Sequence, residues 1–559
     1  MLTKSRYWFL GLVLVLIFAI IGCSDDSNNV DAGEDGNGND DEIHTFHYFN
    51  AAAPGDDLNT ADTTLGKMFE EETGVNFDIE YIVGDVNQKI GTMVASGEYP
   101  ELLNAEQSTD EVIDAGGFVP LNDLIEEYGP NIKETYGPYL EMMKKSDGNI
   151  YVIPAGAGHG YAKPSKPDQA AWWIKREVLK EMDYPHPKTL DEFFDIIEAY
   201  VEDNPTMNDA NTIGFTALAD DWRFFSFSNQ PMHLAGYPND GGSFIDMETQ
   251  EATVYNDKEE TKRWLKKMNE INDKGLFDQE TFTQDYDEYL AKISSGRVVG
   301  FFDYRWQVGE ALDSLELDDD PYSEYMGFPI VFDEDIKGQY LDPTGFMAQP
   351  GLGITTGTSE EDQIRIIKFL DYLAEEETQK LVTWGIEGET YEVDDDGRFY
   401  RTEEQIAKTD DTEFRDEFGF STFEWNWLRK TGEFSDGNAV EPPTQPEVIE
   451  LSYDDDDQEF LDAYGIETFT EIFPEPDERP WFPAHDASIE TGSDARLYEQ
   501  QLDDLMKLEF PNIVFADPSD FEEKWDIFKE EFSELPYEAY EKVMTEYVQE
   551  KARLAEEGE

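Results

Sequence analysis

The chain has 559 residues, of which 127 are Asp or Glu and 41 are Lys or Arg, so its formal net charge is -86. A protein that binds nucleic acid by neutralising phosphates needs the opposite balance, and this composition excludes that class of partner. Hydrophobic residues make up 39% of the chain and aromatic residues 14%, which is too many for a disordered acidic tail. The composition therefore predicts a folded protein, and the mutual repulsion of its acids indicates a salty or alkaline exterior rather than cytosol.

Residues 1–22 have the features of a secretory signal peptide. Lys4 and Arg6 precede an unbroken apolar run, and the segment contains no acid. The run ends at Cys23, the only cysteine of the chain. A small residue directly before a cysteine resembles the bacterial lipobox, in which the thiol is acylated. We therefore expect Cys23 to carry a lipid anchor at the outer face of the cell membrane; an ordinary signal peptide and an uncleaved membrane anchor are the alternatives.

Residues 23–42 are almost all Asp, Asn, Gly, Ser and Glu. This composition cannot bury a core and is typical of a flexible acidic tether. No later segment offers the roughly 20 apolar residues that a membrane-spanning helix needs. We expect the folded body to begin at Ile43 and to be held at the membrane by lipid alone.

Strands and helices alternate through the first part of this body. The pattern predicts strands at 43–49, 77–83, 102–104 and within 147–154, and helices at 60–73, 86–96, 121–128 and 132–144. This alternation is typical of an α/β domain with a largely parallel sheet. The glycine-rich segment 155–160 is a candidate hinge, with an ordinary loop as the alternative.

A second α/β unit begins at Ala170. Its predicted strands are 212–217 and 297–304 together with the one that starts at Ala170, and its predicted helices are 189–201, 262–274 and 285–294. Strands at 325–332 and 353–355 and a helix at 360–376 are predicted after it. From there to Glu559 the chain is rich in helix and in acid. At about 150 residues per domain, the length agrees with two to four folding units.

The motifs of common catalytic and metal sites are absent from the sequence. The six histidines lack the HExxH spacing, and there is no GxSxG elbow or GxxxxGKS phosphate loop. Residues 203–211 weakly resemble a calcium-binding loop, but Pro205 and Met207 stand where oxygen ligands are needed, so a polar turn is expected. We expect neither a metal ion nor a cofactor.

Aromatic side chains gather beside polar ones at predicted strand ends and loops, namely Trp172, Trp173, Trp222, Phe224, Tyr304, Trp306, Trp384, Trp425 and Trp427. A Trp or Tyr ring packs on the apolar face of a sugar ring, while neighbouring Arg, Asp, Glu and Asn bond its hydroxyl groups. A single aromatic residue is more often part of a core. The clustering is what indicates a carbohydrate site.

Five segments resemble the extracellular solute-binding proteins of carbohydrate ABC importers, in the long lipoprotein branch common in Gram-positive bacteria. They are DGNIYVIP from Asp147, WWIKREVLKEMDYPHPKTLDEFFDIIEAYVEDNP from Trp172, ISSGRVVGFFDYRW from Ile293, WGIEGETYEVDDDGRFY from Trp384 and DPSDFEEKWDIFKEEF from Asp517. The resemblance covers nearly the whole chain. It implies an α/β, two-lobed type 2 periplasmic-binding-protein-like fold with a hinge between the lobes and a helix-rich C-terminal extension. Lobe one would be 43–154 and 325–375, and lobe two would be 155–324 and 376–559.

Open α/β sheets bind ligands at the carboxyl ends of their strands. That rule nominates a set of ligand-binding residues, namely Asn50, Glu106, Trp222, Arg223, Asp303, Tyr304, Arg305 and Trp306. Position in the resembled family adds Trp384 and Glu387. We expect stacking on sugar from Trp222, Tyr304, Trp306 and Trp384, and recognition of hydroxyl or carboxylate groups by Arg223, Arg305, Asp303 and Glu106.

The resemblance implies a monomeric receptor, not an enzyme, that captures an oligosaccharide and hands it to the permease subunits of an ABC importer. Two alternatives remain at this point. One is a surface-anchored polysaccharide-degrading enzyme, and the other is a receptor for a peptide or another polar solute on the same fold.

Overall fold

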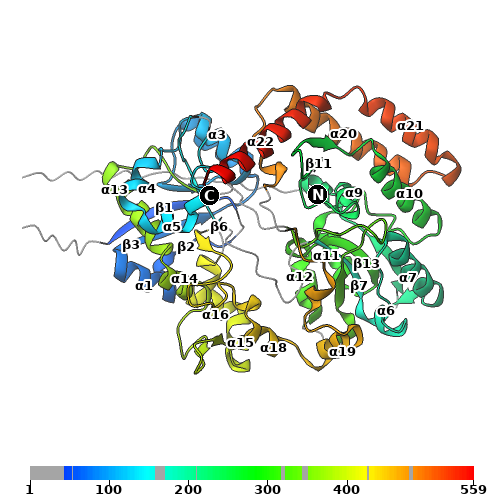
Figure 1. Cartoon of the computed structure of the whole chain (residues 1–559), viewed down its shortest axis with the longest axis horizontal. Helices are drawn as coiled ribbons and strands as arrows, with labels where there is room; N and C mark the ends of the chain where they lie inside the picture. Colours follow the sequence, from blue (N-terminus) through cyan, green and yellow to red (C-terminus); the bar gives the residue numbers. More distant parts are fainter. Residues whose placement is uncertain are drawn as a thin grey trace, which may run out of the picture. The chain divides into compact units, whose positions relative to one another are not determined.

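The computed structural model describes residues 43–558, apart from 53–54, 146, 158–169, 209, 317–320, 343–350, 425–426 and 478–481. The expected signal peptide, tether and lipidated Cys23 lie outside the described residues. Residues from Ile43 onward form one unit, and it contains two large β-sheets (Figure 1). The chain is therefore α/β, as the alternating pattern predicts.

The first sheet has the strand order β2-β3-β1-β4-β15-β5. Its strands are β1 (His44–Asn50), β2 (Leu58–Asn59), β3 (Val75–Tyr81), β4 (Leu102–Asn104), β5 (Ile153–Pro154) and β15 (Gly351–Ile354). The central strand β1 runs parallel to β3 and to β4, whereas β2, β15 and β5 pair in the antiparallel sense. The parallel centre agrees with the alternation of strand and helix, but the sheet as a whole is mixed rather than largely parallel, because its outer strands pair in the antiparallel sense.

Helices at predicted positions accompany this sheet, namely α1 (Thr64–Thr73), α2 (Val86–Ser96), α4 (Asn122–Tyr128), α5 (Pro130–Tyr136) and α13 (Glu360–Leu373), and the short helix α3 (Thr109–Asp114) was not predicted. Capping explains where several begin, since the Thr63 side chain accepts from the third residue of α1 and Asp85 does the same for α2. The helix predicted at 132–144 ends early. Pro138 follows α5, and its ring disfavours a helical conformation at the residue before it.

The second sheet has the strand order β10-β13-β7-β14, with β7 (Ala170–Lys175), β10 (Ile213–Thr216), β13 (Val298–Tyr304) and β14 (Tyr325–Phe328). Strands β10 and β13 are parallel, and β7 runs antiparallel to β13 and β14. Its helices include α6 (Arg176–Glu181), α7 (Leu190–Asp203), α10 (Glu259–Asp273), α11 (Tyr286–Ser294) and α12 (Arg305–Glu316). The fully buried Trp172 lies at the centre of this core, in contact with the rings of Phe193, Phe194, Phe215, Trp264 and Phe302.

The predicted lobe boundaries are wrong in two segments. Strand β14 was expected in lobe one, but it pairs with β7 in the second sheet, and the chain re-enters the first sheet only at β15. The segment after 376 was expected in lobe two, yet helix α14 (Glu376–Thr383) and the buried Trp427 belong to the core of the first sheet. The Trp427 ring packs against Tyr48 of β1 with centroids 5.2 Å apart. Periodicity identifies an apolar face but not the sheet that will cover it.

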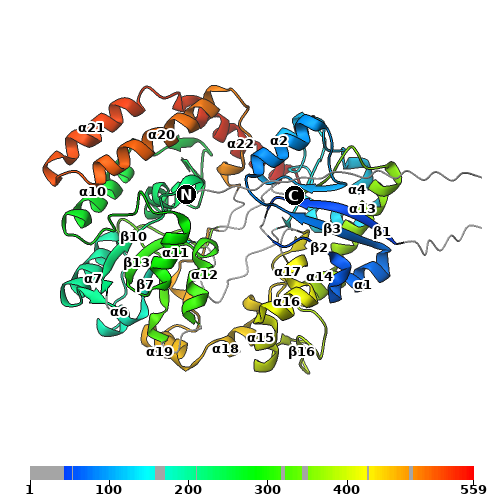
Figure 2. The same ribbon diagram turned by 180° about the vertical axis from the view of Figure 1, so that it is seen from behind.

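The C-terminal helices α20 (Asp494–Val514), α21 (Phe521–Phe532) and α22 (Tyr537–Gly558) form the helix-rich extension, coloured orange to red in Figures 1 and 2. Tyr540, Met544 and Val548 of α22 are buried in the core of the second sheet, and Leu554 packs against the core of the first. Tyr547 contacts both cores. Helix α22 therefore ties the two cores together.

Strands β6 (Gly156–Ala157) and β18 (Arg429–Lys430) pair in parallel next to the candidate hinge. The predicted hinge 155–160 is described only as far as Ala157. Within the described ranges, no helix has both the length and the apolar composition required to cross a membrane.

Candidate functional site

Three aromatic rings lie nearly parallel at the carboxyl edge of the second sheet. Trp222 and Trp306 are 4° from parallel with centroids 6.1 Å apart, and Phe225 lies 5.9 Å from Trp222 and 6.1 Å from Trp306 at 17° and 15°. Trp222 is 55% exposed and Trp306 is 53% exposed, whereas every other described tryptophan is buried. We call these three residues the aromatic platform.

The sheet topology explains why these rings meet. Strands β10 and β13 are parallel neighbours, so the segments that follow them leave the sheet at the same edge. Trp222 lies in the 3-10 turn Asp221–Phe224 after β10, and Trp306 lies at the start of α12 directly after β13. Asp221 has φ 47°, a left-handed conformation that is uncommon outside glycine. Large exposed apolar rings in a group are unusual on a soluble surface and mark a binding site.

The buried carboxylate of Asp303 accepts hydrogen bonds from residues next to the aromatic platform. It accepts hydrogen bonds from Gln307 Nε2 at 2.7 Å and from Ser226 Oγ at 3.2 Å on one oxygen, and from Tyr289 Oη at 2.8 Å on the other. Ser226 directly follows Phe225 and Gln307 directly follows Trp306, so one carboxylate connects the two segments that carry the rings. Burial raises the pKa of Asp303 to about 6, while these donors oppose the rise.

The prediction that Asp303 contacts the ligand is corrected by its burial. The side chain has no exposed surface, and its oxygens are already occupied by protein donors. Asp303 is therefore a positioning residue.

The predicted stacking role of Tyr304 is corrected in the same way. Tyr304 is 2% exposed, and its hydroxyl lies 2.7 Å from Nε2 of His233. Burial lowers the pKa of His233 to about 3, so this imidazole is neutral at ordinary pH. The Tyr304 ring supports the platform, with its centroid 5.4 Å from Phe225 and 5.9 Å from Trp306.

The two predicted arginines differ in their surroundings. The Arg305 guanidinium forms an ion pair with Asp313 at 2.7 Å. This ion pair accounts for Arg305 as a structural residue. The Arg223 guanidinium carbon lies 4.6 Å from the centre of the Trp222 ring and 4.0 Å from that of Tyr286. Such cation–π contacts hold a guanidinium in place without using its N–H groups.

A second group of predicted residues lies at the carboxyl edge of the first sheet. Asn50 ends β1 and stands opposite Asn104, which ends the parallel strand β4. Both are buried. Glu106 follows with φ 48°, and its backbone N–H donates to Asn104 Oδ1 at 3.1 Å. Burial raises the pKa of Glu106 to about 7.

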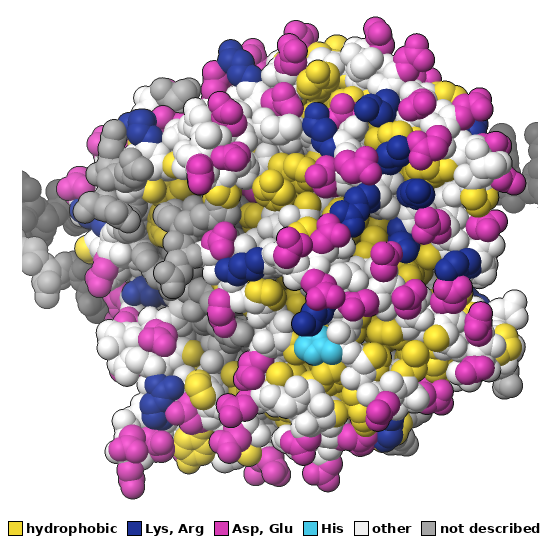
Figure 3. Space-filling view, turned by 45° about the vertical axis from the view of Figure 1, so that its right-hand side comes forward, with side chains coloured by type: hydrophobic (Ala, Val, Ile, Leu, Met, Phe, Trp, Pro, Cys, Tyr) yellow, Lys and Arg dark blue, Asp and Glu magenta, His cyan; other side chains and the backbone are white. Residues whose placement is uncertain are grey.

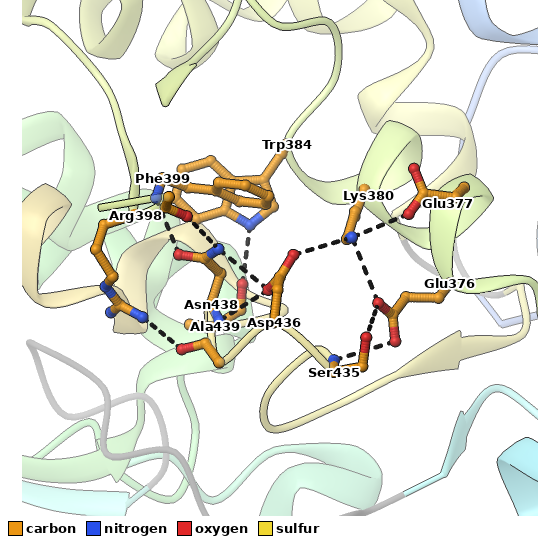
Figure 4. Close-up of polar contacts among 12 residues, drawn as sticks. Glu376, Glu377, Lys380, Trp384, Arg398, Phe399, Ser435, Asp436, Asn438 and Ala439 are labelled. Carbon is orange, nitrogen blue, oxygen red and sulfur yellow. Dashed lines mark hydrogen bonds and ion pairs between the residues drawn. The ribbon is translucent and has the colours of Figure 1, made fainter. Parts of the chain in front are cut away.

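The family-based candidates Trp384 and Glu387 belong to neither group. Trp384 has no exposed surface, its indole N–H donates to the Ala439 carbonyl at 2.9 Å, and its ring packs on Phe399 in a small separate core (Figure 4). The predicted stacking role of Trp384 is therefore corrected to a packing role. Gly385 has φ 87°, and a Cβ there would lie 2.3 Å from Thr390 Oγ1, so this position of the turn requires glycine. Glu387 is exposed beside it.

Sequence reasoning missed Phe225, Gln307, Tyr286 and Asn104. Phe225 follows the candidate segment 222–224 and Gln307 follows Trp306, so extending each segment by one residue would have found them. Tyr286, at the start of α11, is brought in only by tertiary packing. Asn104 ends the short apolar strand LLN, which was predicted, and its terminal polar residue was the available signal.

The structure offers no metal-ligand cluster in the part of the chain that it describes. Within that part, no group of three or more His, Cys, Asp or Glu side chains could hold a metal ion. The segment that weakly resembles a calcium loop forms a small hairpin of β8 (Thr206–Met207) and β9 (Ala210–Asn211), apart from residue 209, which is not described.

Comparison with known proteins matches more than half of the chain to one protein family. The profile of the family described as bacterial extracellular solute-binding protein matches residues 64–386. The fructooligosaccharide ABC transporter substrate-binding protein FusA of Streptococcus pneumoniae is 27% identical over 269 residues, covering 45% of this chain and 48% of FusA. The polygalacturonan/rhamnogalacturonan-binding protein YtcQ of Bacillus subtilis is 25% identical over 358 residues, covering 61% of this chain and 66% of YtcQ. The alignments thus span about half to two thirds of these relatives' own length.

Solved structures give a likeness over the whole folded body. The FusA EF-hand mutant in complex with fructo-nystose has a TM-score of 0.62 at 18% identity and covers 91% of this chain and 99% of that one. A solute-binding protein from Bifidobacterium longum infantis has a TM-score of 0.62 at 14% identity and covers 92% and 100%. At such identities the likeness establishes the fold.

Proposed function

Because this chain belongs to the family of bacterial extracellular solute-binding proteins, we propose that it captures an oligosaccharide outside the cell and delivers it to an ABC importer. The name of FusA refers to fructooligosaccharide and that of YtcQ to polygalacturonan and rhamnogalacturonan, which supports a sugar as the ligand. The observation that carries the proposal is the exposed, near-parallel pair Trp222 and Trp306.

The chemistry of this platform suits sugar rings. The C–H face of a pyranose or furanose ring is apolar and packs on an indole face, and each such contact contributes about 1 kcal/mol. Hydroxyl groups at the ring edge need donors and acceptors, which Arg223 at the second sheet and Glu106 at the first can supply. Glu106 has a pKa of about 7, so near neutral pH it exists in both the accepting and the donating form.

Binding and turnover measurements test this proposal. We expect isothermal titration calorimetry against a panel of neutral and acidic oligosaccharides to show saturable binding, and tryptophan fluorescence to change on binding because the two platform indoles are exposed. Incubation with the corresponding polymers should release no reducing ends or unsaturated products. Sustained product release would instead identify a surface-anchored polysaccharide-degrading enzyme, and heat from peptides alone would identify a peptide receptor.

We further propose that Cys23 is acylated and anchors a monomeric receptor at the outer face of the membrane. Mature protein from the producing cells should fractionate with membranes and yield an N-terminal peptide with the mass of a diacylglyceryl cysteine. The Cys23→Ser variant should appear in the membrane-free fraction. A Cys23→Ser protein that stayed with the membrane, or a released body that ran as a dimer in light scattering, would contradict the corresponding part of the proposal.

A further inference from the structure

We propose that Arg223 makes the site selective for oligosaccharides that carry carboxylate groups. This inference rests on the proposed function and deepens it by naming the class of sugar. The Arg223 guanidinium lies over the rings of both Trp222 and Tyr286, so it borders the exposed part of the aromatic platform. Cation–π contacts of this kind do not use the N–H groups of the guanidinium, so these groups keep their capacity to donate to a ligand.

Arg223 has no acidic partner among the residues that the structure describes. No described carboxylate lies within ion-pair distance of it, and its Nε is buried with no hydrogen-bond acceptor in the described structure. Arg305, in the segment that carries Trp306, pairs with Asp313 at 2.7 Å. With 127 acids and 41 bases in the chain, an arginine without an acid is not explained by a shortage of acids. A carboxylate of the ligand would supply the missing partner.

The charges around this position allow an acidic ligand to bind. Asp287 and Glu310, on α11 and α12, are exposed and act on the Tyr286 hydroxyl electrostatically. Exposed charges are screened within about 10 Å at 0.1 M salt. Asp303 acts on the same hydroxyl, but hydrogen bonds from the protein stabilise its carboxylate. A direct guanidinium–carboxylate contact is short and charge-assisted, so it outweighs these screened repulsions.

Arginine chemistry makes the selection strong. A guanidinium presents a planar fork of N–H donors that matches the two oxygens of a carboxylate, while a neutral hydroxyl can use only one donor at a time. A hydrogen bond to a charged group is stronger than one between neutral groups, which corresponds to about a 10- to 100-fold difference in affinity.

Matched ligands test the inference. We would titrate trigalacturonate and its fully methylated ester into the wild-type protein, R223Q, and the matched control R297Q. Arg297 is partly exposed, has no ion pair among the described residues and precedes the opposite end of β13. Wild type and R297Q should bind the acid about 10- to 100-fold more tightly than the ester. R223Q should lose that preference by weakening for the acid while its affinity for the ester stays within about twofold.

Other results would overturn the inference. Equal weakening of acid and ester in R223Q would mean that Arg223 only supports Trp222. If the wild type binds neutral oligosaccharides but neither trigalacturonate nor a second acid, trimannuronate, the inference fails while the proposed function stands. If no saccharide of either kind binds, the proposed function fails and this inference fails with it.

Discussion

The indole rings of Trp222 and Trp306 lie 4° from parallel with their centroids 6.1 Å apart, although 84 positions separate the two residues in the chain. Each ring follows a different strand of the same sheet. Each also leaves more than half of its surface in water. The relationship exists because β10 and β13 are parallel neighbours, and it turns two unrelated segments into one apolar surface.

Removing one indole should weaken sugar binding. We expect Trp306→Ala to lower affinity for a bound oligosaccharide about five- to thirtyfold, because a stacking contact of about 1 to 2 kcal/mol is lost. Calorimetry at fixed salt measures this. Phe515→Ala removes another exposed ring, 38% exposed at the end of α20, and should leave affinity unchanged. Equal affinity for Trp306→Ala and wild type would remove the platform from the site.

Loss of the Asp303 carboxylate should loosen the platform. Asp303→Ala leaves the buried donors of Ser226, Gln307 and Tyr289 without their acceptor, so we expect it to lower the free energy of unfolding by about 2 to 4 kcal/mol. Sugar affinity should fall as well, because the segments carrying Phe225 and Trp306 lose their common anchor. Asp303→Asn keeps one acceptor oxygen, so its free energy of unfolding and its sugar affinity should lie between those of wild type and Asp303→Ala. Urea unfolding and calorimetry on the same samples decide this, and an unchanged affinity in Asp303→Ala would refute the positioning role.

The buried Asp486 should make stability depend on pH. One of its carboxylate oxygens is buried without a hydrogen-bond partner in the described structure, and burial raises its pKa to about 7 despite the positive charges of Lys551 and Lys145. Lys551 Nζ donates to the carbonyl of Met142 rather than to Asp486.

The sign of the pH effect follows from proton binding. Between pH 4 and 7 the folded state holds a proton on Asp486 that the unfolded state has released, so the free energy of unfolding should fall as pH rises through this range. We expect the fall in the free energy of unfolding between pH 4 and 7 to be about 2 to 4 kcal/mol smaller in Asp486→Asn than in wild type. The variant should therefore be more stable than wild type at pH 8. Exposed Asp396→Asn is the control. Parallel pH profiles for wild type and Asp486→Asn would contradict the expectation.

Salt should stabilise the folded body. Figure 3 shows acidic side chains spread over the face that it presents, with basic ones fewer among them. Repulsion among them is screened over about 10 Å at 0.1 M salt and about 3 Å at 1 M, so the melting temperature should rise from low to molar NaCl. Sucrose at matched osmolality controls for general solute exclusion. A melting temperature that stays flat or falls in NaCl would show that repulsion does not limit stability.

Elements with a strong local signal could be predicted from their own residues. Helix α2 occupies 86–96 as expected, because Asp85 caps its start and Gly97 ends it in a left-handed conformation. The parallel pairing of β1 with β3 follows from the helix between them. The rule that ligands bind at strand ends placed Asn50 and Glu106 together, and it placed Trp222 near Trp306, because edge position depends only on strand direction.

What each side chain does at those edges depended on packing that no local pattern contains. Asp303, Tyr304 and Trp306 are near neighbours in one segment, yet the first two are buried and the third is half exposed. Trp384 and Trp306 were both predicted to stack on sugar, but Trp384 is fully buried, and its indole bonds a residue 55 positions away. Composition and periodicity predict the export signal and determined the α/β class and the strand edges, since these follow from local chemistry. Only tertiary structure decided which rings meet water, because burial is set by contacts between residues far apart in the chain.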